Sequence, residues 1–539
     1  MERQSHGQKK TAEPIQHPAA RMANALEIAA LWGVLLFALM LLYTSLTSTN
    51  YIDPANYSGQ HIIAHTDNIV FNLIVTAVAI AIFRLLRVIR LPRWFVLSAC
   101  IVFLAALAFI GIAWSLLMRA TPISDQQVLF SSALNLVKGD YSALQDTTGY
   151  EYFYFVRFPF QLGFLSILEG MVRIFGERGT LVAAPILNVL LLMSGYAALL
   201  MTTDRLFGDL RVTFLTLLLL CLCPQPVFAC VWLYGLIPAL AFALWSVYFA
   251  VRFVQSGKVS SALLAAGFSA MAVYCKPNAW ISAVALAIVL VLHALKTRGW
   301  KPLVAAVLLL GLCIPLPKLV QAAYEERIGV SFGKGYPMSA WMAMGMRDSW
   351  MASGWYNAYS KEMYNTYGTD LEAIAARNKK DIEKSQKKFA KDPREAGQFY
   401  QEKFASQWNE STFESIWIAV VTEPYGGGDR ASLAQSLYDG RWPGEMLEKG
   451  LNYILQVVYA GFVLGTIVIM RKRESIQLIF PITILGGLLF HLLFEANSKY
   501  ALTYVPMFLP IAAYGILTFG VNASALFTKQ TDKTGKDAV

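Results

Sequence analysis

Apolar residues recur along this chain in stretches of membrane-spanning length, from Ala25 to Phe519. A helix needs about 20 apolar residues to cross a bilayer. Twelve stretches reach or approach that length: 25–47, 67–87, 94–117, 178–203, 211–228, 233–254, 259–275, 277–296, 302–324, 448–470, 475–494 and 501–525. The pattern predicts an all-α polytopic membrane protein with about 12 transmembrane helices.

Polar segments divide the chain between these stretches. The predicted parts are a tail (1–24), transmembrane helices 1–3 (25–117), a first large loop (118–177), helices 4–9 (178–324), an insert (325–447), helices 10–12 (448–525) and a second tail (526–539). The insert is expected to be mainly helical. Its charged run 371–406 predicts a solvated helix interrupted at Asp392-Pro393, and this run is interpreted as scaffold.

The range 158–176 is apolar enough to span but carries Glu169 and Arg173 one helical turn apart. Counting it as a span would move every later basic loop to the other side of the membrane. We therefore expect an amphipathic helix on the outer surface, with Glu169 and Arg173 paired and facing water or headgroups.

Short basic loops favour the cytoplasmic side. They hold Arg84, Arg87, Arg90 and Arg93; Arg205 and Arg211; Arg252 and Lys258; Lys296, Arg298 and Lys301; and the segment 471–474. Twelve spans place all these loops and both basic termini on one side. The loop 118–177 and the insert then face outward from a plasma membrane.

Composition supports the membrane class and removes two alternatives. Hydrophobic residues make up 56% of the chain and charged residues 15%, against about 25% charged in soluble domains. The net charge of +10 comes from basic residues concentrated at the ends of apolar stretches, so nucleic acid is not an expected partner. All six cysteines fall in or at the ends of apolar segments, and nothing suggests a disulfide framework.

Asp125 follows the third stretch by about eight residues and precedes the helical pattern 128–137, which Gly139 should end. By position alone it is a first-turn acid. Five basic residues depart from the positive-inside bias: Arg119, Arg157, Arg178, Lys276 and Lys499. Either each snorkels to the interface by itself, or they converge on one site for a phosphate at the membrane surface.

His491 and Glu495 are four residues apart, so we expect them to share a helix face. They lack a third metal ligand, and a hydrogen-bonded pair lining a polar cavity is favoured over a zinc site. The aromatic run 150–158 suits an interfacial belt or stacking on a sugar ring. Trp355 and Tyr356 suit carbohydrate contact or packing of the insert on the bilayer.

Several stretches resemble a known family. "SDQQVLFSSALNLVKGDYSAL" (124–144) and "RFPFQLGF" (157–164) resemble the first outer loop of GT-C membrane glycosyltransferases, especially bacterial members related to the protein O-mannosyltransferases of glycosyltransferase family 39. "CKPNAWI" (275–281), "GMRDSWMASGWYN" (345–357) and "FEANSKYALTYVPMFLPIAAYG" (494–515) resemble later elements of that family. The resemblance extends over about 115–520.

The resemblance implies transfer of a sugar from a polyprenyl-phosphate donor to a hydroxyl of an envelope glycan, lipid or protein. Asp125 would be the catalytic base. Arg157, Lys276 and Lys499 would bind the donor phosphate, and the implied substrate contacts are Gln126, Tyr154, Gln161, His491, Glu495 and Tyr500. Many relatives carry a second acid where this chain has Gln126. No cofactor is assigned, and dependence on a divalent metal is left in doubt.

A transporter or a lipid or polysaccharide flippase is the alternative, because twelve spans with both termini inside is a common transporter topology. Transporters tend to show paired halves and interrupted helices at mid-membrane. In this chain the halves differ, and the polar residues gather near one surface. The sequence therefore favours the transferase.

Overall fold

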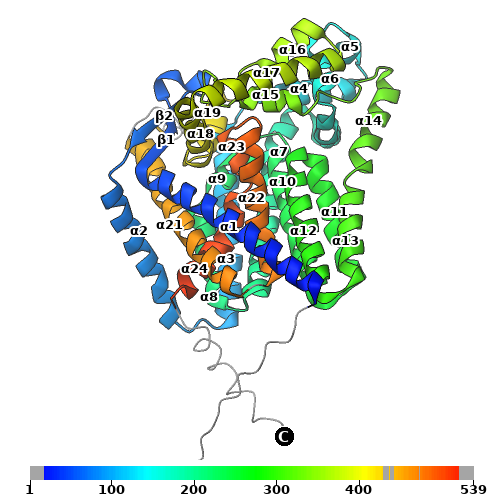
Figure 1. The fold of residues 1–539 in the computed structure, drawn as a ribbon. Helices are drawn as coiled ribbons and strands as arrows, with labels where there is room; N and C mark the ends of the chain where they lie inside the picture. The colour runs from blue at the N-terminus through cyan, green and yellow to red at the C-terminus, as the bar shows by residue number, and fades with distance from the viewer. Residues whose placement is uncertain (1–16, 429–435, 438–441, 473, 521–539) are drawn as a thin grey trace, which may run out of the picture.

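The computed structural model describes residues 17–428, 436–437, 442–472 and 474–520, in which long helices form a bundle and shorter ones lie across one end (Figure 1). The bundle contains α1 (Pro18–Thr47), α2 (Ile69–Arg84), α3 (Arg93–Met118), α7 (Leu162–Phe207), α8 (Leu210–Leu222), α10 (Leu236–Ser256), α11 (Val259–Cys275), α12 (Trp280–Thr297), α13 (Trp300–Leu312), α14 (Pro315–Ile328), α21 (Trp442–Lys472), α22 (Ile479–Leu493) and α24 (Val505–Thr518). Residues 1–16 of the predicted first tail, residue 473 and the second tail 526–539 lie outside the described residues.

Within the described ranges, nine helical segments are long and apolar enough to cross a membrane. A tenth arises if α8 and the segment Gln225–Val231, bent by 50°, count as one span, and α11 and α24 are shorter apolar helices. Together these account for all twelve predicted stretches. The bend lies at Cys223 and Pro224, just before Pro226, and neither proline can donate a backbone hydrogen bond. The predicted class, an all-α polytopic membrane protein, is confirmed.

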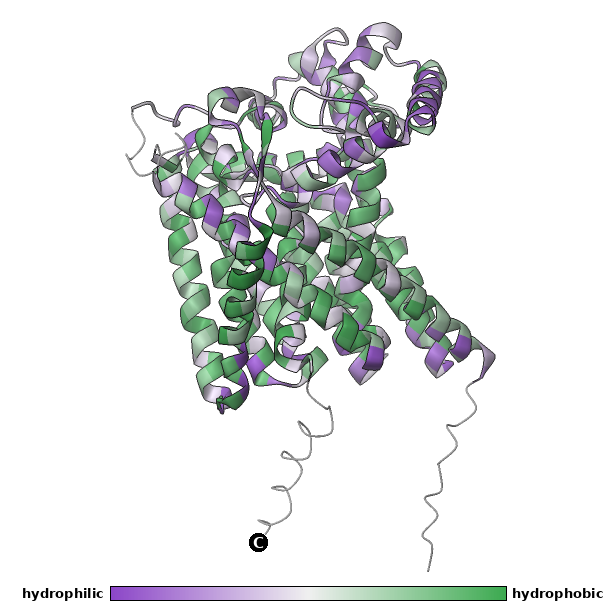
Figure 2. Ribbon diagram, turned by 60° about the vertical axis from the view of Figure 1, so that its left-hand side comes forward, coloured by the Kyte–Doolittle hydropathy of each residue, from purple (hydrophilic) through white to green (hydrophobic). Residues whose placement is uncertain are grey.

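The basic loops meet at one end of the bundle. Arg84 and Arg87 donate to the carbonyls of Phe519 and Leu517, at 2.8 and 2.6 Å. Lys296 pairs with Glu27 of α1 at 2.5 Å. We call this the basic-loop end, and the end under the insert the insert end. Figure 2 shows apolar residues along the bundle and polar ones concentrated in the insert. Which side of a membrane each end faces stays a prediction.

A hairpin that the sequence did not predict joins α1 to α2. Strands β1 (Ser48–Ile52) and β2 (Ile62–Thr66) pair antiparallel, with Ser48 opposite Thr66. The Nδ2 of Asn409, in the insert, donates to the carbonyl of Ser48 at 2.6 Å. The hairpin therefore anchors the insert above the bundle.

The segment before Gly176 departs from its prediction in one respect. Gly176 (φ 69°, ψ −178°) interrupts α7 between the predicted outer helix and the predicted span. Arg173 and Glu169 do pair, at 2.6 Å. However, Glu169 is 5% exposed and does not face water. It also accepts from the Tyr324 hydroxyl at 2.6 Å and from Arg327 at 2.7 Å, because α14 packs against this segment.

The insert is mainly helical, as predicted. It contains α15 (Ser339–Gly345), α16 (Tyr359–Tyr367), α17 (Leu371–Lys391), α18 (Pro393–Trp408) and α19 (Ser415–Val420). The charged run breaks at Asp392, whose carboxylate accepts from the N–H groups of Arg394 and Glu395 and so caps α18. Lys403 of α18 donates to the carbonyls of Gly345, Leu492 and Phe494, which ties the insert to the end of α22.

One suggested role in the insert is wrong. Trp355 is fully buried and donates through Nε1 to Ser406 of α18 at 2.9 Å. The residue therefore packs inside the insert, because α18 covers it, and not on the bilayer.

Candidate functional site

Asp125 begins α4 (Asp125–Lys138), which ends at Gly139 with φ 76°, as the sequence predicts. Its carboxylate lies in the first turn, where the helix dipole favours a negative charge. Its Oδ2 also accepts a 2.6 Å hydrogen bond from the hydroxyl of Tyr234, 109 residues further along the chain. Asp125 is therefore oriented by tertiary structure and is more than a first-turn acid.

Tyr234 lies in a tight loop before α10. Its hydroxyl donates to Asp125 and accepts from Nε2 of Gln161 at 2.5 Å. The neighbouring N–H of Leu233 donates to Oε1 of Gln126 at 3.0 Å. Gly235 follows with φ 70°, and a Cβ there would lie 2.3 Å from the Cys275 carbonyl oxygen. Gln126 and Gln161, predicted as substrate contacts, thus use these amide atoms to hold the Tyr234 loop.

Lys276 follows α11 directly and is 6% exposed. Its ammonium lies 3.7 Å from the centroid of the Tyr234 ring. Among the described residues it forms no ion pair and its Nζ has no protein hydrogen-bond acceptor. Burial lowers its pKa from 10.5 to about 7, although the nearby charges of Asp125 and Glu495 act in the opposite direction. A buried ammonium without a carboxylate partner is suited to binding an anion.

Lys499 approaches the same place from the other side. Its Nζ lies 3.3 Å from Oε2 of Glu414 and 5.7 Å from the Trp232 ring centroid. Glu414 is fully buried and also accepts from Nε2 of Gln60 at 2.5 Å. Phe413 and Glu414 have φ of 48° and 56°, a left-handed conformation that costs a non-glycine residue about 1–3 kcal/mol. Strained backbone is therefore maintained where Glu414 holds Lys499.

Glu495 does not share a helix face with His491 as predicted, because α22 ends at Leu493 and Phe494 is extended. The contact between them is from His491 Nδ1 to the backbone carbonyl of Glu495, at 3.3 Å. Burial raises the pKa of the Glu495 carboxyl to about 7, with Lys499 opposing and Asp125 adding to the rise. His491 stacks on Tyr500 at 5.5 Å.

These contacts define a carboxylate–ammonium cluster of Asp125, Lys276, Glu495 and Lys499. Each pKa shift cited above includes the charges of other members, so the four groups are electrostatically coupled. Of the five outer basic residues, the structure brings Lys276 and Lys499 together here, and their role in binding a phosphate stays a prediction. Arg178 is exposed on α7 instead, and the Arg119 carbonyl accepts from the N–H of Tyr425.

Arg157 reaches the cluster from the insert side. It ends α6 (Tyr150–Arg157), is buried, and places its guanidinium 5.1 Å from the Phe158 ring. Burial raises the pKa of Tyr356, Arg157 lowers it, and Glu495 and Asp125 raise it further. The Tyr356 hydroxyl is therefore within the electrostatic influence of both Arg157 and the cluster.

The aromatic run 150–158 turns inward and does not form an interfacial belt along its length. Tyr154 and Phe155 are fully buried. Burial raises the pKa of the Tyr154 hydroxyl, the charge of Asp125 adds to the rise, and the neighbouring Tyr234 and Gln161 side chains oppose it.

Sequence reasoning missed Trp232, Tyr234 and Glu414. The signal for the first two was an aromatic pair followed by glycine between two spans, in "WLYG" (232–235). Their rings stack with centroids 4.9 Å apart, and they contact both lysines. For Glu414 the sequence offers no comparable signal, because its partners Gln60 and Lys499 are distant in the chain.

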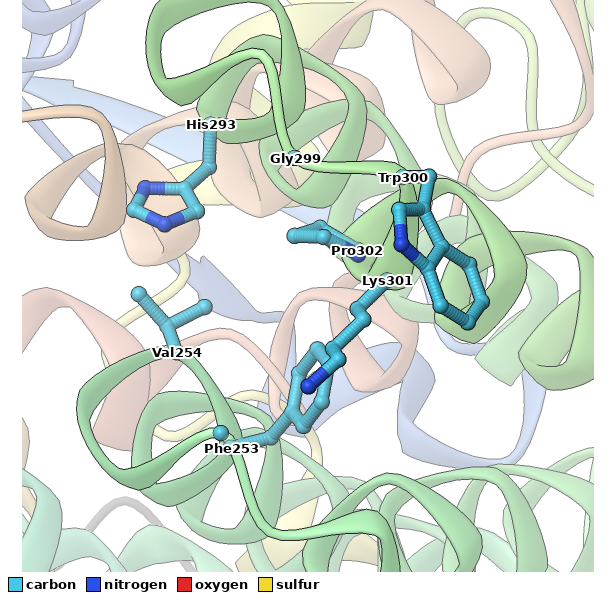
Figure 3. A pocket seen from close by; sticks show the side chains of 8 residues that line it. Phe253, Val254, His293, Gly299, Trp300, Lys301 and Pro302 are labelled. Atoms are coloured by element: carbon cyan, nitrogen blue, oxygen red, sulfur yellow. The ribbon is translucent and has the colours of Figure 1, made fainter.

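Two hollows in the structure are candidates for a ligand-binding site. A narrow crevice of about 20 Å³ has Lys276 in its wall and otherwise mostly apolar lining from α10, α12 and α24, including Leu240 and Met507. A larger hollow of about 270 Å³ lies at the basic-loop end, between Phe253, His293 and Trp300 (Figure 3). It contains no carboxylate and is separate from the cluster, so we assign the chemistry to the insert end.

In the part of the chain that the structure describes, no group of three or more His, Cys, Asp or Glu side chains could hold a metal ion. The nearest approach considered from sequence, His491 with Glu495, presents a backbone oxygen to the imidazole rather than a carboxylate.

Fold and site together define a polytopic helical membrane protein with a buried ionisable cluster at one end. A family model described as "conserved hypothetical integral membrane protein" matches residues 21–518, and the chain belongs to that family. None of the curated proteins compared matches it. The solved structure of ArnT from Cupriavidus metallidurans in the apo state is similar, with 14% identity, 77% of each chain covered and a TM-score of 0.34. At that score the likeness adds nothing to the argument about the site.

Proposed function

We propose that this protein is a GT-C-type membrane glycosyltransferase. It transfers a sugar from a polyprenyl-phosphate donor to a hydroxyl of an envelope glycan, lipid or protein on the extracytoplasmic face. The observation that carries the proposal is the pairing of opposite chemistries at the insert end: a tyrosine-oriented carboxylate, Asp125, beside a buried ammonium without an acid partner, Lys276.

Lys276 and Lys499 serve the leaving group. When the bond between the anomeric carbon and the phosphate oxygen breaks, negative charge grows on the departing polyprenyl phosphate. Ammonium groups already fixed at that point stabilise it without reorganisation, an effect worth roughly 10²–10³ in rate for one group. Arg157, whose charge also acts on the Tyr356 hydroxyl, contributes to the positive field.

Asp125 serves the acceptor. As general base it removes the proton of the attacking hydroxyl while the new bond to the anomeric carbon forms. Tyr234 fixes the direction of Oδ2 through its 2.6 Å hydrogen bond. The proton leaves Asp125 to water after transfer, which restores the carboxylate.

The apolar crevice beside Lys276 suits the donor's lipid. Its walls from α10, α12 and α24 are mostly apolar, and Lys276 contributes an ammonium group to it. A polyprenyl chain entering between these helices, which would have to open the crevice, would place its phosphate near Lys276. A polar headgroup and an apolar tail would thus each contact matching surface.

The test uses purified protein in nanodiscs, incubated with a panel of polyprenyl-phosphate sugars and a crude envelope acceptor fraction. Free polyprenyl phosphate is measured. We expect release by wild type and a loss of about 10²–10⁴-fold in Asp125→Asn. The asparagine Oδ1 still accepts from Tyr234, so folding is preserved.

Asp140→Asn is the matched control, because Asp140 lies in the same loop but bonds only to Ser142 locally. It should release polyprenyl phosphate as wild type does. Near-normal release by Asp125→Asn would remove Asp125 from the mechanism. No release by folded wild type from any donor would favour the transporter alternative.

A further inference from the structure

Helix α17 carries a line of lysines on one face. Lys380, Lys384, Lys387 and Lys391 follow one another at intervals of four, three and four residues, which is the spacing of a single helix face. They extend over about 16 Å at 1.5 Å per residue. All four are exposed. Like charges at these spacings repel and destabilise a helix unless nearby acids compensate them.

No carboxylate does so in the described residues. None of these four lysines forms an ion pair, and neither does Glu383, the acid beside them. Neighbouring basic residues differ: Arg377 pairs with Asp381 at 2.9 Å and Lys388 with Glu395 at 2.7 Å. Residues 377–394 contain eight basic and three acidic side chains. The lysine stripe (Lys380, Lys384, Lys387, Lys391) is therefore a surface of uncompensated positive charge.

The opposite face of α17 is fixed to the protein. Asn378 is fully buried and donates through Nδ2 to Ser339 of α15 at 3.0 Å, and the Tyr359 hydroxyl donates to Asp381 at 2.9 Å. In Figure 1, α17 lies on the side of α15 away from the bundle, with α16 further out. The stripe lies on the face of α17 away from its anchor on α15, and α15 in turn bonds to the segment after α22, so headgroups of the bilayer are not its natural partner.

The same anchor connects α17 to the carboxylate–ammonium cluster. The N–H of Glu495 donates to the carbonyl of Trp341 in α15 at 3.1 Å. A single short helix, α15, therefore contacts both α17 and the segment that carries Glu495. A molecule held on the stripe would be presented at a fixed position relative to the cluster.

We infer that the lysine stripe is the docking site of an anionic envelope polymer, a glycan that bears repeating phosphate or carboxylate groups, and that this polymer is the acceptor. The inference of an acceptor rests on the proposed function; the binding site itself does not. Regularly spaced ammonium groups match a chain of repeated anions, because each further contact forms at high effective concentration. Exposed charge pairs are screened by salt, so binding should weaken as ionic strength rises.

The test measures binding of inorganic polyphosphate, as a polyanion probe, to the full-length protein in nanodiscs of zwitterionic lipid. We expect Lys384→Glu/Lys387→Glu to weaken binding at least tenfold. The matched control Lys138→Glu/Lys334→Glu reverses two exposed charges outside the stripe, and should stay within about twofold of wild type. The neutral variant Lys384→Gln/Lys387→Gln should fall between them, and neutral dextran should not bind.

The same measurement in Asp125→Asn should give wild-type binding, since that variant alters only the proposed chemistry. Equal binding by the stripe and control variants would overturn the proposal. So would a stripe variant that loses association only with vesicles of anionic lipid and keeps its affinity for polyphosphate. Binding through the stripe without sugar transfer from any donor would reject the proposed function and leave the binding site standing.

Discussion

Basic side chains occur at both ends of the helical bundle, but they are held in different ways. At the basic-loop end, Arg84 and Arg87 donate to carbonyls that close α24, and Lys296 pairs with the buried Glu27. Cations at a helix C-terminus satisfy orphan carbonyls and complement the helix dipole. These positive charges are therefore compensated within the folded protein.

At the insert end, Lys276 lies over the Tyr234 ring without an acid partner among the described residues. A ring face offers a cation much less than a carboxylate does. The positive charge therefore remains available to an incoming anion. Lys276 and Lys296 therefore differ in their partners: Lys296 pairs with a buried acid, and Lys276 has no acid partner among the described residues.

The most direct test of this difference is to replace one lysine with methionine at each end of the bundle. Lys276→Met should lower donor kcat/KM by about 10²–10³-fold, because a charge that stabilises the leaving phosphate is lost. Stability should stay near wild type, since no buried acid is stranded. Donor and acceptor Michaelis constants are measured together with thermal unfolding, and donor use should suffer more.

Lys296→Met is the counterpart. It leaves Glu27 buried with Ser475 as a remaining partner among the described residues, and breaking a buried pair costs about 3–5 kcal/mol. We expect a clear loss of thermal stability and normal activity per folded molecule. Lys276 and Lys296 do not have different roles if both variants lose stability alike, or if Lys296→Met loses donor affinity while it remains folded.

The pH dependence of donor kcat/KM tests the role of the Lys276 charge further. Burial lowers the pKa of Lys276 from 10.5 to about 7, so its charge is present below pH 7 and lost above it. Donor kcat/KM should fall as pH rises through 7, by up to tenfold per unit. Stability moves the opposite way: between pH 7 and 10.5 the unfolded chain binds a proton that the folded chain does not, so this residue's contribution rises with pH.

Lys276→Arg shows whether the decline of donor kcat/KM above pH 7 comes from Lys276, because arginine keeps its charge over the whole pH range. Its rate should be lower, but the decline above pH 7 should disappear. Glu495→Gln is the control, since burial also raises the Glu495 pKa to about 7. If the decline in donor kcat/KM persists in Lys276→Arg and disappears in Glu495→Gln, the titrating group is Glu495 instead.

Local features of this protein were predictable from sequence and tertiary ones were not. The spans, the helix from Asp125 to Gly139 and the break at Asp392 each depend on a short window of residues. The burial of Glu169 depends on Tyr324 and Arg327, more than 150 residues away. Periodicity carries no information about such partners.

The candidate site likewise contains residues that the sequence could indicate and residues that it could not. Lys276 and Lys499 were predictable because they depart from the positive-inside bias near span ends. Tyr234 and Glu414 were not, because only folding brings them beside Asp125 and Lys499. The His491–Glu495 error arose from extending a helix two residues past its end at Leu493, where sequence boundaries are least certain.

The smallest expected effect tests whether Tyr234 orients Asp125. Tyr234→Phe removes the hydroxyl but keeps the ring under Lys276. A hydrogen bond to a charged group is worth roughly 1.5–3 kcal/mol, so kcat should fall about tenfold or somewhat more while donor KM is unchanged. Tyr196→Phe is the matched control, because its buried hydroxyl in α7 has no hydrogen-bond partner among the described residues and its loss should change little. In an Asp125→Asn background, Tyr234→Phe should have almost no further effect on kcat, since the hydroxyl acts through that carboxylate. Additive losses in this double-mutant cycle, or a rise in donor KM, would show that the hydroxyl acts on the substrate directly.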